Sequence, residues 1–146
     1  MAMTAVAFHS GLSDRLGFAC RLLRKAYRQG HRVLVTAPVE LLAQIDRDLW
    51  TFEAGAFIPH LALDGRHGAA AQARTPIWLA PAADGVEGPS VLVNLGSDSP
   101  ADPLRFERIV ELVTDDPDDR RSARARWRTY EALGLKIDHH LPGSEA

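Results

Sequence analysis

The sequence predicts an α/β protein with a mostly parallel sheet that helices cover on both faces. Short β-branched runs alternate with longer segments of helical periodicity, and this alternation is typical of parallel strands joined by helices. The chain has 146 residues, of which 46% are hydrophobic and 25% are charged. This size is enough for one sizeable core, so we expect a single domain over residues 1–146.

The first half of the chain predicts the order strand, helix, strand, helix. Each expected strand is a short run of mostly apolar residues, and each helix has apolar residues at helical spacing. Gly30 suits the end of the first helix, and Pro38 suits the start of the second. The four expected elements are a strand over 6–8, a helix over 13–29, a strand over 32–36 and a helix over 39–50.

The second half is expected to begin with a long irregular connection over residues 57–74, because this stretch is rich in glycine and alanine. Residues 106–113 fit either a helix or a strand. We favour a strand, because the polar residues that follow, with Pro117, supply a turn and the acidic start of a helix. The remaining expected elements are strands over 77–79, 91–95 and 109–113, a helix over 118–133 and a flexible tail over 139–146.

Composition limits the classes of function. The formal net charge is −2 and the pI is near 6.3, whereas domains that bind phosphate backbones usually carry a positive excess. Direct DNA binding is therefore disfavoured. Cys20 is the only cysteine and is expected to be a buried thiol, which fits a reducing cytosol. We find neither the pattern of a signal peptide nor that of a membrane span, so we expect a cytoplasmic protein that does not enter membranes.

The helix expected over 118–133 carries the most informative pattern. Arg120, Arg124 and Arg128 lie four residues apart, which places their guanidinium groups on one face, and Trp127 lies one turn from Arg124. A cationic face with an aromatic floor suits a short acidic peptide, because it can hold a carboxylate and a hydrophobic side chain together. The alternative is a solvated face whose arginines pair with nearby acidic residues. These residues are Asp118, Asp119 and Glu131.

The sequence contains no motif for catalysis or for cofactor binding. The loops after the first two expected strands match neither G-x-G-x-x-G nor G-x-x-x-x-G-K-[ST]. The six histidines are scattered, and the adjacent His139 and His140 would point apart on a strand, which makes a poor metal site. Helix capping explains Ser10 or Ser13, with Asp14, better than a hydrolase does. We therefore expect no cofactor, no metal and no catalytic residue.

Several segments together resemble the chi subunit of bacterial DNA polymerase III, and the similarity spans nearly the whole chain. The most specific features are Leu49-Trp50, followed seven residues later by F-[IV]-P-H, and a C-terminal R-x-R-[WY]-[KR]-x-Y motif. Residues 63–74 and the segment after Gly134 depart from the family, so no role is carried over to them. The matching segments are 25–35, Asp48-Leu49-Trp50, Phe57-Ile58-Pro59-His60, 91–95 and 124–130 with Gly134.

The resemblance implies a Rossmann-like three-layer sandwich that binds no nucleotide and serves as a non-enzymatic replication subunit. Chi proteins link the clamp loader, through the psi subunit, to single-stranded DNA-binding protein. The disordered acidic tail of that protein ends in an apolar residue with the terminal carboxylate, and contact with DNA would be indirect. Carried over by position, the residues that bind this tail are Arg120, Arg124, Trp127, Arg128 and Val113.

The resemblance also implies a second surface, formed by Trp50, Phe57, Pro59 and His60. The matching positions in chi contact psi, and the same surface serves an XPD-like helicase that competes for it; another clamp-loader component could also occupy it. From the residues alone, a core position is the more common explanation for Trp50 and Phe57. Two other functions stay open, a nucleotide-dependent enzyme on a degenerate Rossmann-like sheet and a direct DNA-binding module.

Overall fold

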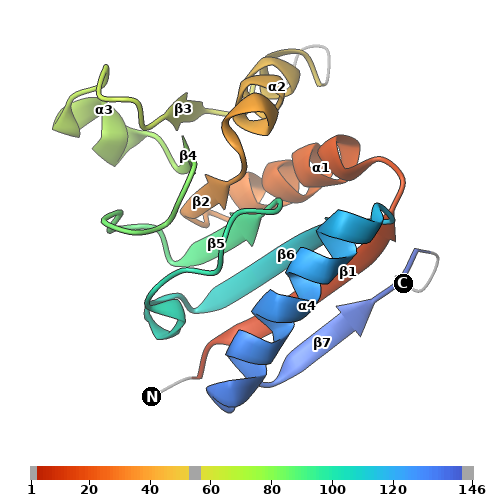
Figure 1. The fold of residues 1–146 in the computed structure, drawn as a ribbon. Helices are drawn as coiled ribbons and strands as arrows, with labels where there is room; N and C mark the ends of the chain where they lie inside the picture. The colour runs from red at the N-terminus through yellow and green to blue at the C-terminus, as the bar shows by residue number, and fades with distance from the viewer. Residues whose placement is uncertain (1–2, 53–56, 143–146) are drawn as a thin grey trace.

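The computed structural model describes residues 3–52 and 57–142 as a three-layer α/β sandwich (Figure 1). Within these residues, one seven-stranded sheet has the order β3-β4-β2-β5-β6-β1-β7, and all paired neighbours are parallel, which confirms the predicted fold class. The strands are β1 (Ala5–Leu12), β2 (Val33–Thr36), β3 (His60–Ala62), β4 (Ile77–Ala80), β5 (Val91–Asn94), β6 (Arg108–Thr114) and β7 (Ile137–His140). The helices are α1 (Arg15–Arg28), α2 (Val39–Thr51), α3 (Ala69–Arg74), α4 (Pro117–Ala132) and the short 3₁₀ helix η1 (Pro103–Arg105).

Two apolar clusters hold the helices to the two faces of the sheet. On one face, Leu23 of α1 and Ile45 of α2 belong to a cluster with the strand residues of β2, β4 and β5. On the other face, Tyr130 of α4 packs with Phe8 and Ile109. β2, β4 and β5 are buried along their whole length, which is the pattern of parallel strands covered on both sides. Figure 1 shows α4 lying over the β6-β1-β7 side of the sheet and α2 at its β3-β4-β2 side.

The connection expected over 57–74 is wrong in part, because it contains β3 and α3. β3 is three residues long and pairs with β4, so it is too short to show a hydrophobic period. α3 is held by groups from elsewhere in the chain. Nε1 of Trp78 donates to the carbonyl oxygens of Gln72 and Thr75, at 3.0 and 2.8 Å, and Arg32 donates to the carbonyl of Ala73 at 3.1 Å. These partners are distant in sequence or follow the helix, and no local pattern signals them.

The segment after Gly134 forms β7, which pairs in parallel with β1. His139 and His140 are the last residues of this strand, so the expectation of a flexible tail over 139–146 is wrong for these two residues. Residues 143–146 lie outside the described part of the chain. β1 is also longer than expected and continues to Leu12, with a register shift against β6 between His9 and Leu12. The residues of β7 are exposed or half-buried, so the strand shows little apolar alternation in the sequence. Its backbone pairing with β1 makes this segment a strand.

The remaining elements agree with the prediction apart from their ends. Residues 108–114 form a strand, as expected. Helix α1 begins one residue after Asp14, whose Oδ1 accepts a hydrogen bond from the backbone N–H of Gly17 at 3.0 Å, so Asp14 is the cap and neither Ser10 nor Ser13 is. Among the residues that the structure describes, no helix is long and apolar enough to cross a membrane, and no cluster of three potential ligands could hold a metal.

Cys20 is buried, as predicted, with 1% of its surface exposed. Burial, with smaller contributions from Asp48 and Asp14, raises the pKa of its thiol to about 11. Because only the thiolate attacks a disulfide reagent, the folded protein should react with Ellman's reagent at about pH 8 at least about tenfold more slowly than the protein unfolded in urea. Equal rates in the two states would show that the thiol is accessible in the native fold.

Candidate binding pocket on helix α4

A pocket of about 510 Å³ lies between α4 and the carboxyl ends of β1, β6 and β7. α4 forms one wall, and residues at the ends of β1 and β7 form the other. The structure brings together in this pocket all five residues assigned to one site from the sequence. These are Arg120, Arg124, Trp127, Arg128 and Val113. The other lining residues are Phe8, Ser10, Gly11, Asp115, Ala123, Glu131, His139 and Leu141.

The three pocket arginines are exposed and form no salt bridge with any residue that the structure describes. Two of the acidic residues that could have neutralised them are engaged elsewhere. Asp118 pairs with Arg121 at 2.8 Å. Asp119 accepts hydrogen bonds from Arg15 at 2.9 Å and from the backbone and hydroxyl of Thr114 at 2.8 and 2.9 Å. The positive charge of Arg120, Arg124 and Arg128 therefore remains available to an anionic ligand.

The floor of the pocket is apolar. Trp127 is half-buried, and its ring lies 4.9 Å from the ring of Phe8, measured between centroids. Val113 and Ala123 are 1% and 6% exposed, so they contribute a floor beneath the aromatic rings. A hydrophobic side chain that enters the pocket would contact this floor while the guanidinium groups remain at the rim. The arrangement can hold an acidic peptide by charge and an apolar residue by burial.

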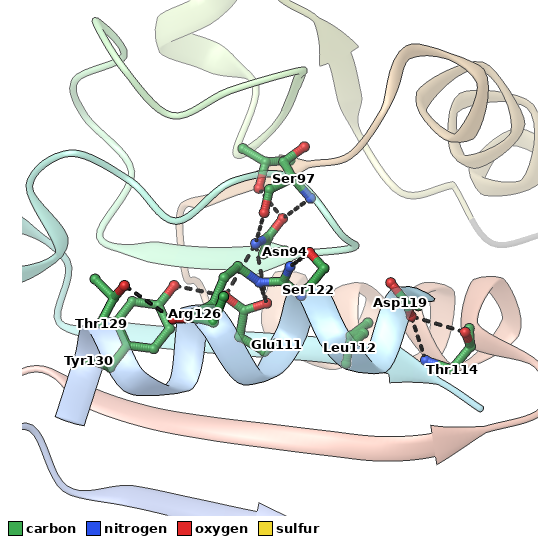
Figure 2. A network of polar contacts seen from close by, with 12 residues as sticks. Asn94, Ser97, Glu111, Leu112, Thr114, Asp119, Ser122, Arg126, Thr129 and Tyr130 are labelled. Carbon is green, nitrogen blue, oxygen red and sulfur yellow. Dashed lines mark hydrogen bonds and ion pairs between the residues drawn. The ribbon is translucent and has the colours of Figure 1, made fainter. Parts of the chain in front are cut away.

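A buried polar network fixes the rotation of α4 about its axis (Figure 2). Nε of Arg126 donates to Oε1 of Glu111 at 2.9 Å, and the side chains of the two residues are 4% and 0% exposed. The hydroxyl of Tyr130 donates to Oε2 of Glu111 at 2.7 Å. Figure 2 shows Arg126 and Tyr130 pointing from α4 toward Glu111 on β6. With these two side chains turned inward, the arginines at 120, 124 and 128 are left on the outer face.

Asn94 of β5 extends the network across the sheet. Its Nδ2 lies 3.2 Å from both carboxylate oxygens of Glu111 and also donates to the carbonyl of Ser97 at 2.8 Å. Its Oδ1 accepts hydrogen bonds from the hydroxyl of Thr36 and from the backbone N–H of Ser97, both at 2.9 Å. Three neighbouring strands and α4 therefore share one set of hydrogen bonds.

The network shifts the ionisation of its members. Burial raises the pKa of Glu111, and the charge of Arg126, together with hydrogen bonds from Tyr130 and Asn94, acts against this rise. Burial and the adjacent carboxylate raise the pKa of Tyr130, so its hydroxyl stays protonated and remains a donor.

The sequence prediction missed Glu111 and Arg126. A signal was present, because Glu111 interrupts an apolar strand run and Arg126 lies on the same helix face as Ala123 and Tyr130.

The structure places the second group of predicted residues at the end of α2. Trp50 and Phe57 are each 56% exposed, and their ring centroids are 5.1 Å apart, so neither is a core residue. Pro59 is half-buried. His60 is 8% exposed, and its ring nitrogens lie 2.7 and 3.2 Å from the carbonyl oxygens of Ile58 and Asp46. The His60 ring packs against the ring of Trp50, with centroids 5.1 Å apart, and little of it is accessible to a partner.

Comparison with known proteins identifies relatives of the whole chain. Residues 3–138 match the family described as DNA polymerase III chi subunit, HolC. The chain is also 35% identical, over 146 residues, to the DNA polymerase III subunit chi of Pseudomonas aeruginosa. This similarity covers 96% of this chain and 99% of that protein, so it extends over α4 and over the aromatic surface formed by Trp50 and Phe57.

The buried network predicts a large difference between two arginines of α4. Arg126→Met should lower the free energy of unfolding by about 3–5 kcal/mol, because the loss of one partner leaves a buried carboxylate uncompensated. Arg121→Met is the matched control, since the Arg121–Asp118 pair is exposed, and it should cost less than about 1 kcal/mol. Urea unfolding near neutral pH measures both. Similar losses in the two variants would mean that the pair does not anchor α4.

Proposed function

The chain belongs to the DNA polymerase III chi subunit family, so we propose that its α4 pocket binds the acidic C-terminal tail of single-stranded DNA-binding protein. Membership of this family makes the protein an accessory subunit in DNA replication. Through this contact the subunit would link that protein to the clamp loader. The observation that supports the proposal best is one pocket that combines an apolar floor with three exposed arginines, none of which pairs with an acidic residue in the described part of the chain. No catalytic role is part of the proposal.

The chemistry of the pocket matches that of the tail. Aspartates and the terminal carboxylate of the tail would lie at the guanidinium groups, and its last apolar side chain would lie on Trp127 and Val113. Each exposed ion pair contributes only about 0.2–1 kcal/mol, and a buried apolar side chain about 1.5–3 kcal/mol. Micromolar affinity corresponds to about 8 kcal/mol, so the charges and the floor are both needed.

We further propose that Trp50 and Phe57 form the surface that contacts the clamp loader, either psi or another of its components, with an XPD-like helicase as a competing partner. Two large aromatic rings that are more than half exposed and in contact with each other are typical of interface anchors. This surface lies at the end of α2, and Figure 1 shows α2 at the side of the sheet away from β7. The pocket is lined by residues of α4, β1 and β7. The two partners could then bind at the same time.

The pocket predicts a specific loss of binding when its arginines are removed. Arg124→Ala and Arg128→Ala should each weaken binding of a peptide with the tail sequence by at least several-fold, because each substitution removes one charged hydrogen-bond donor. Arg121→Ala is the control, since Arg121 lies on the same helix but does not line the pocket. Fluorescence anisotropy with a labelled peptide measures the dissociation constants, and urea unfolding checks that stability is unchanged.

Two further arms of this experiment test the nature of the ligand. Amidation of the terminal carboxylate and an increase in salt concentration should both weaken the peptide complex. An oligonucleotide of the same net charge should bind more weakly than the peptide. Unchanged peptide affinity in both arginine variants, or tighter binding of the oligonucleotide, would refute the assignment.

The aromatic surface predicts a substitution that separates binding from stability. Phe57→Ala should lower the free energy of unfolding by about 1 kcal/mol or less, because the ring is exposed, whereas truncation of a buried phenylalanine costs about 3–5 kcal/mol. The variant should still bind the tail peptide but should no longer co-purify with the clamp loader. Co-purification at the wild-type level would remove Phe57 from the interface.

A further inference from the structure

The wall of the pocket opposite α4 contains a histidine that the sequence patterns did not assign to the site. His139 pairs in register with Phe8, and register partners in a parallel sheet direct their side chains to the same face. Phe8 contacts Trp127 on α4, and the ring of His139 also stands edge-on to Trp127, with centroids 5.6 Å apart. His139 is exposed and lines the pocket, so its imidazole faces the same space as the arginines.

One ring nitrogen of His139 is held by a hydrogen bond to a described residue, and the other is not. Its Nε2 lies 3.0 Å from the hydroxyl oxygen of Ser10 on β1, and the Trp127 ring limits its rotation. Its Nδ1 forms no hydrogen bond with any residue that the structure describes. A protonated imidazole donates from both nitrogens, whereas a neutral one has a single donor. Protonation therefore adds a charged donor to the pocket wall that β1 and β7 form opposite α4.

The charges around His139 determine what its protonation does. The ionisable side chains that share the pocket are Arg120, Arg124, Arg128 and Glu131 on α4 and Asp115 in the loop after β6. On β1 it forms a hydrogen bond with Ser10. His9 and His140 stack on each other, with ring centroids 4.6 Å apart, and His9 contacts Phe18 of α1 on the opposite face of the sheet. The pocket already contains three arginines and two carboxylates, and a proton on His139 adds one more positive charge. The attraction of the pocket for an anionic ligand then increases.

We infer that His139 is a ligand-binding residue of this pocket, one that donates a hydrogen bond to a carboxylate of the acidic peptide and thereby couples peptide binding to proton uptake. The inference rests on the proposed function of the pocket. It adds a second wall to the site: α4 holds the peptide from one side through its arginines, and β7 holds it from the other through His139. The affinity for an acidic peptide is then higher when His139 carries the additional proton.

The test compares wild type with His139→Gln, which keeps a polar side chain but cannot take up a proton. Isothermal titration calorimetry with the tail peptide at about pH 7.5 and about pH 5.5 should show about two- to fivefold tighter binding at the lower pH for wild type, the effect of one exposed ion pair. The peptide carboxylates stay ionised over this range. His139→Gln should show the same affinity at both values. His31→Gln, an exposed histidine before β2, is the control and should keep the wild-type dependence.

A second readout counts the protons directly. Titrations near pH 6.5, in two buffers that differ in ionisation enthalpy, should show proton uptake on binding for wild type and no net uptake for His139→Gln. If the variant binds more weakly by the same factor at both pH values, His139 only supports Trp127 and the inference is wrong. If it keeps the full pH dependence, the inference is also wrong. Failure of wild type to bind the peptide at either pH would instead refute the proposed function.

Discussion

The ion pair between Glu111 and Arg126 is the interaction on which the rest of the pocket depends. Both side chains are almost completely buried, and a buried charge is strongly destabilising unless it is paired with an opposite charge. Tyr130 and Asn94 complete the coordination of the carboxylate. An apolar contact would allow α4 to rotate or slide on the sheet, whereas directional bonds to one carboxylate do not. The angular position of α4, and with it the direction of its exposed arginines, follows from this pairing.

A second constraint acts at the start of the same helix. Pro117 and the cap Asp116 begin α4, and Oδ2 of Asp116 accepts a hydrogen bond from the backbone N–H of Asp119 at 3.1 Å. Asp119 in particular ties α4 to Arg15 of α1 and to the end of β6. The acidic residues that favour the helix start are thereby kept from neutralising the pocket arginines. One short segment, 116–119, thus both stabilises the helix and preserves the charge of its outer face.

The position of the sheet edges separates the two proposed surfaces. β7 adds a last strand beside β1 and provides a wall facing α4, so the pocket lies at one end of the strand order. Trp50 lies near the other end, on the helix that follows β2, and Phe57 comes after that helix and contacts Trp50. The central strands are buried on both faces and form a rigid separator between them. A protein that joins two partners benefits from this arrangement, because neither partner obstructs the other.

The sequence by itself determined the features that depend on neighbours a few residues away. Apolar periodicity located α1 and α2, and the polar turn with Pro117 and the acidic residues after it located the start of α4. Short buried runs located β2, β4, β5 and β6, and the four-residue spacing of the arginines placed them on one helix face. Only the tertiary structure decided the features that depend on distant contacts. The pairing of β7 with β1, the burial of Glu111 against Arg126 and the exposure of Trp50 each involve residues brought together by folding. Local patterns carry no record of such partners, because the free energy that selects them arises only when the strands and helices pack.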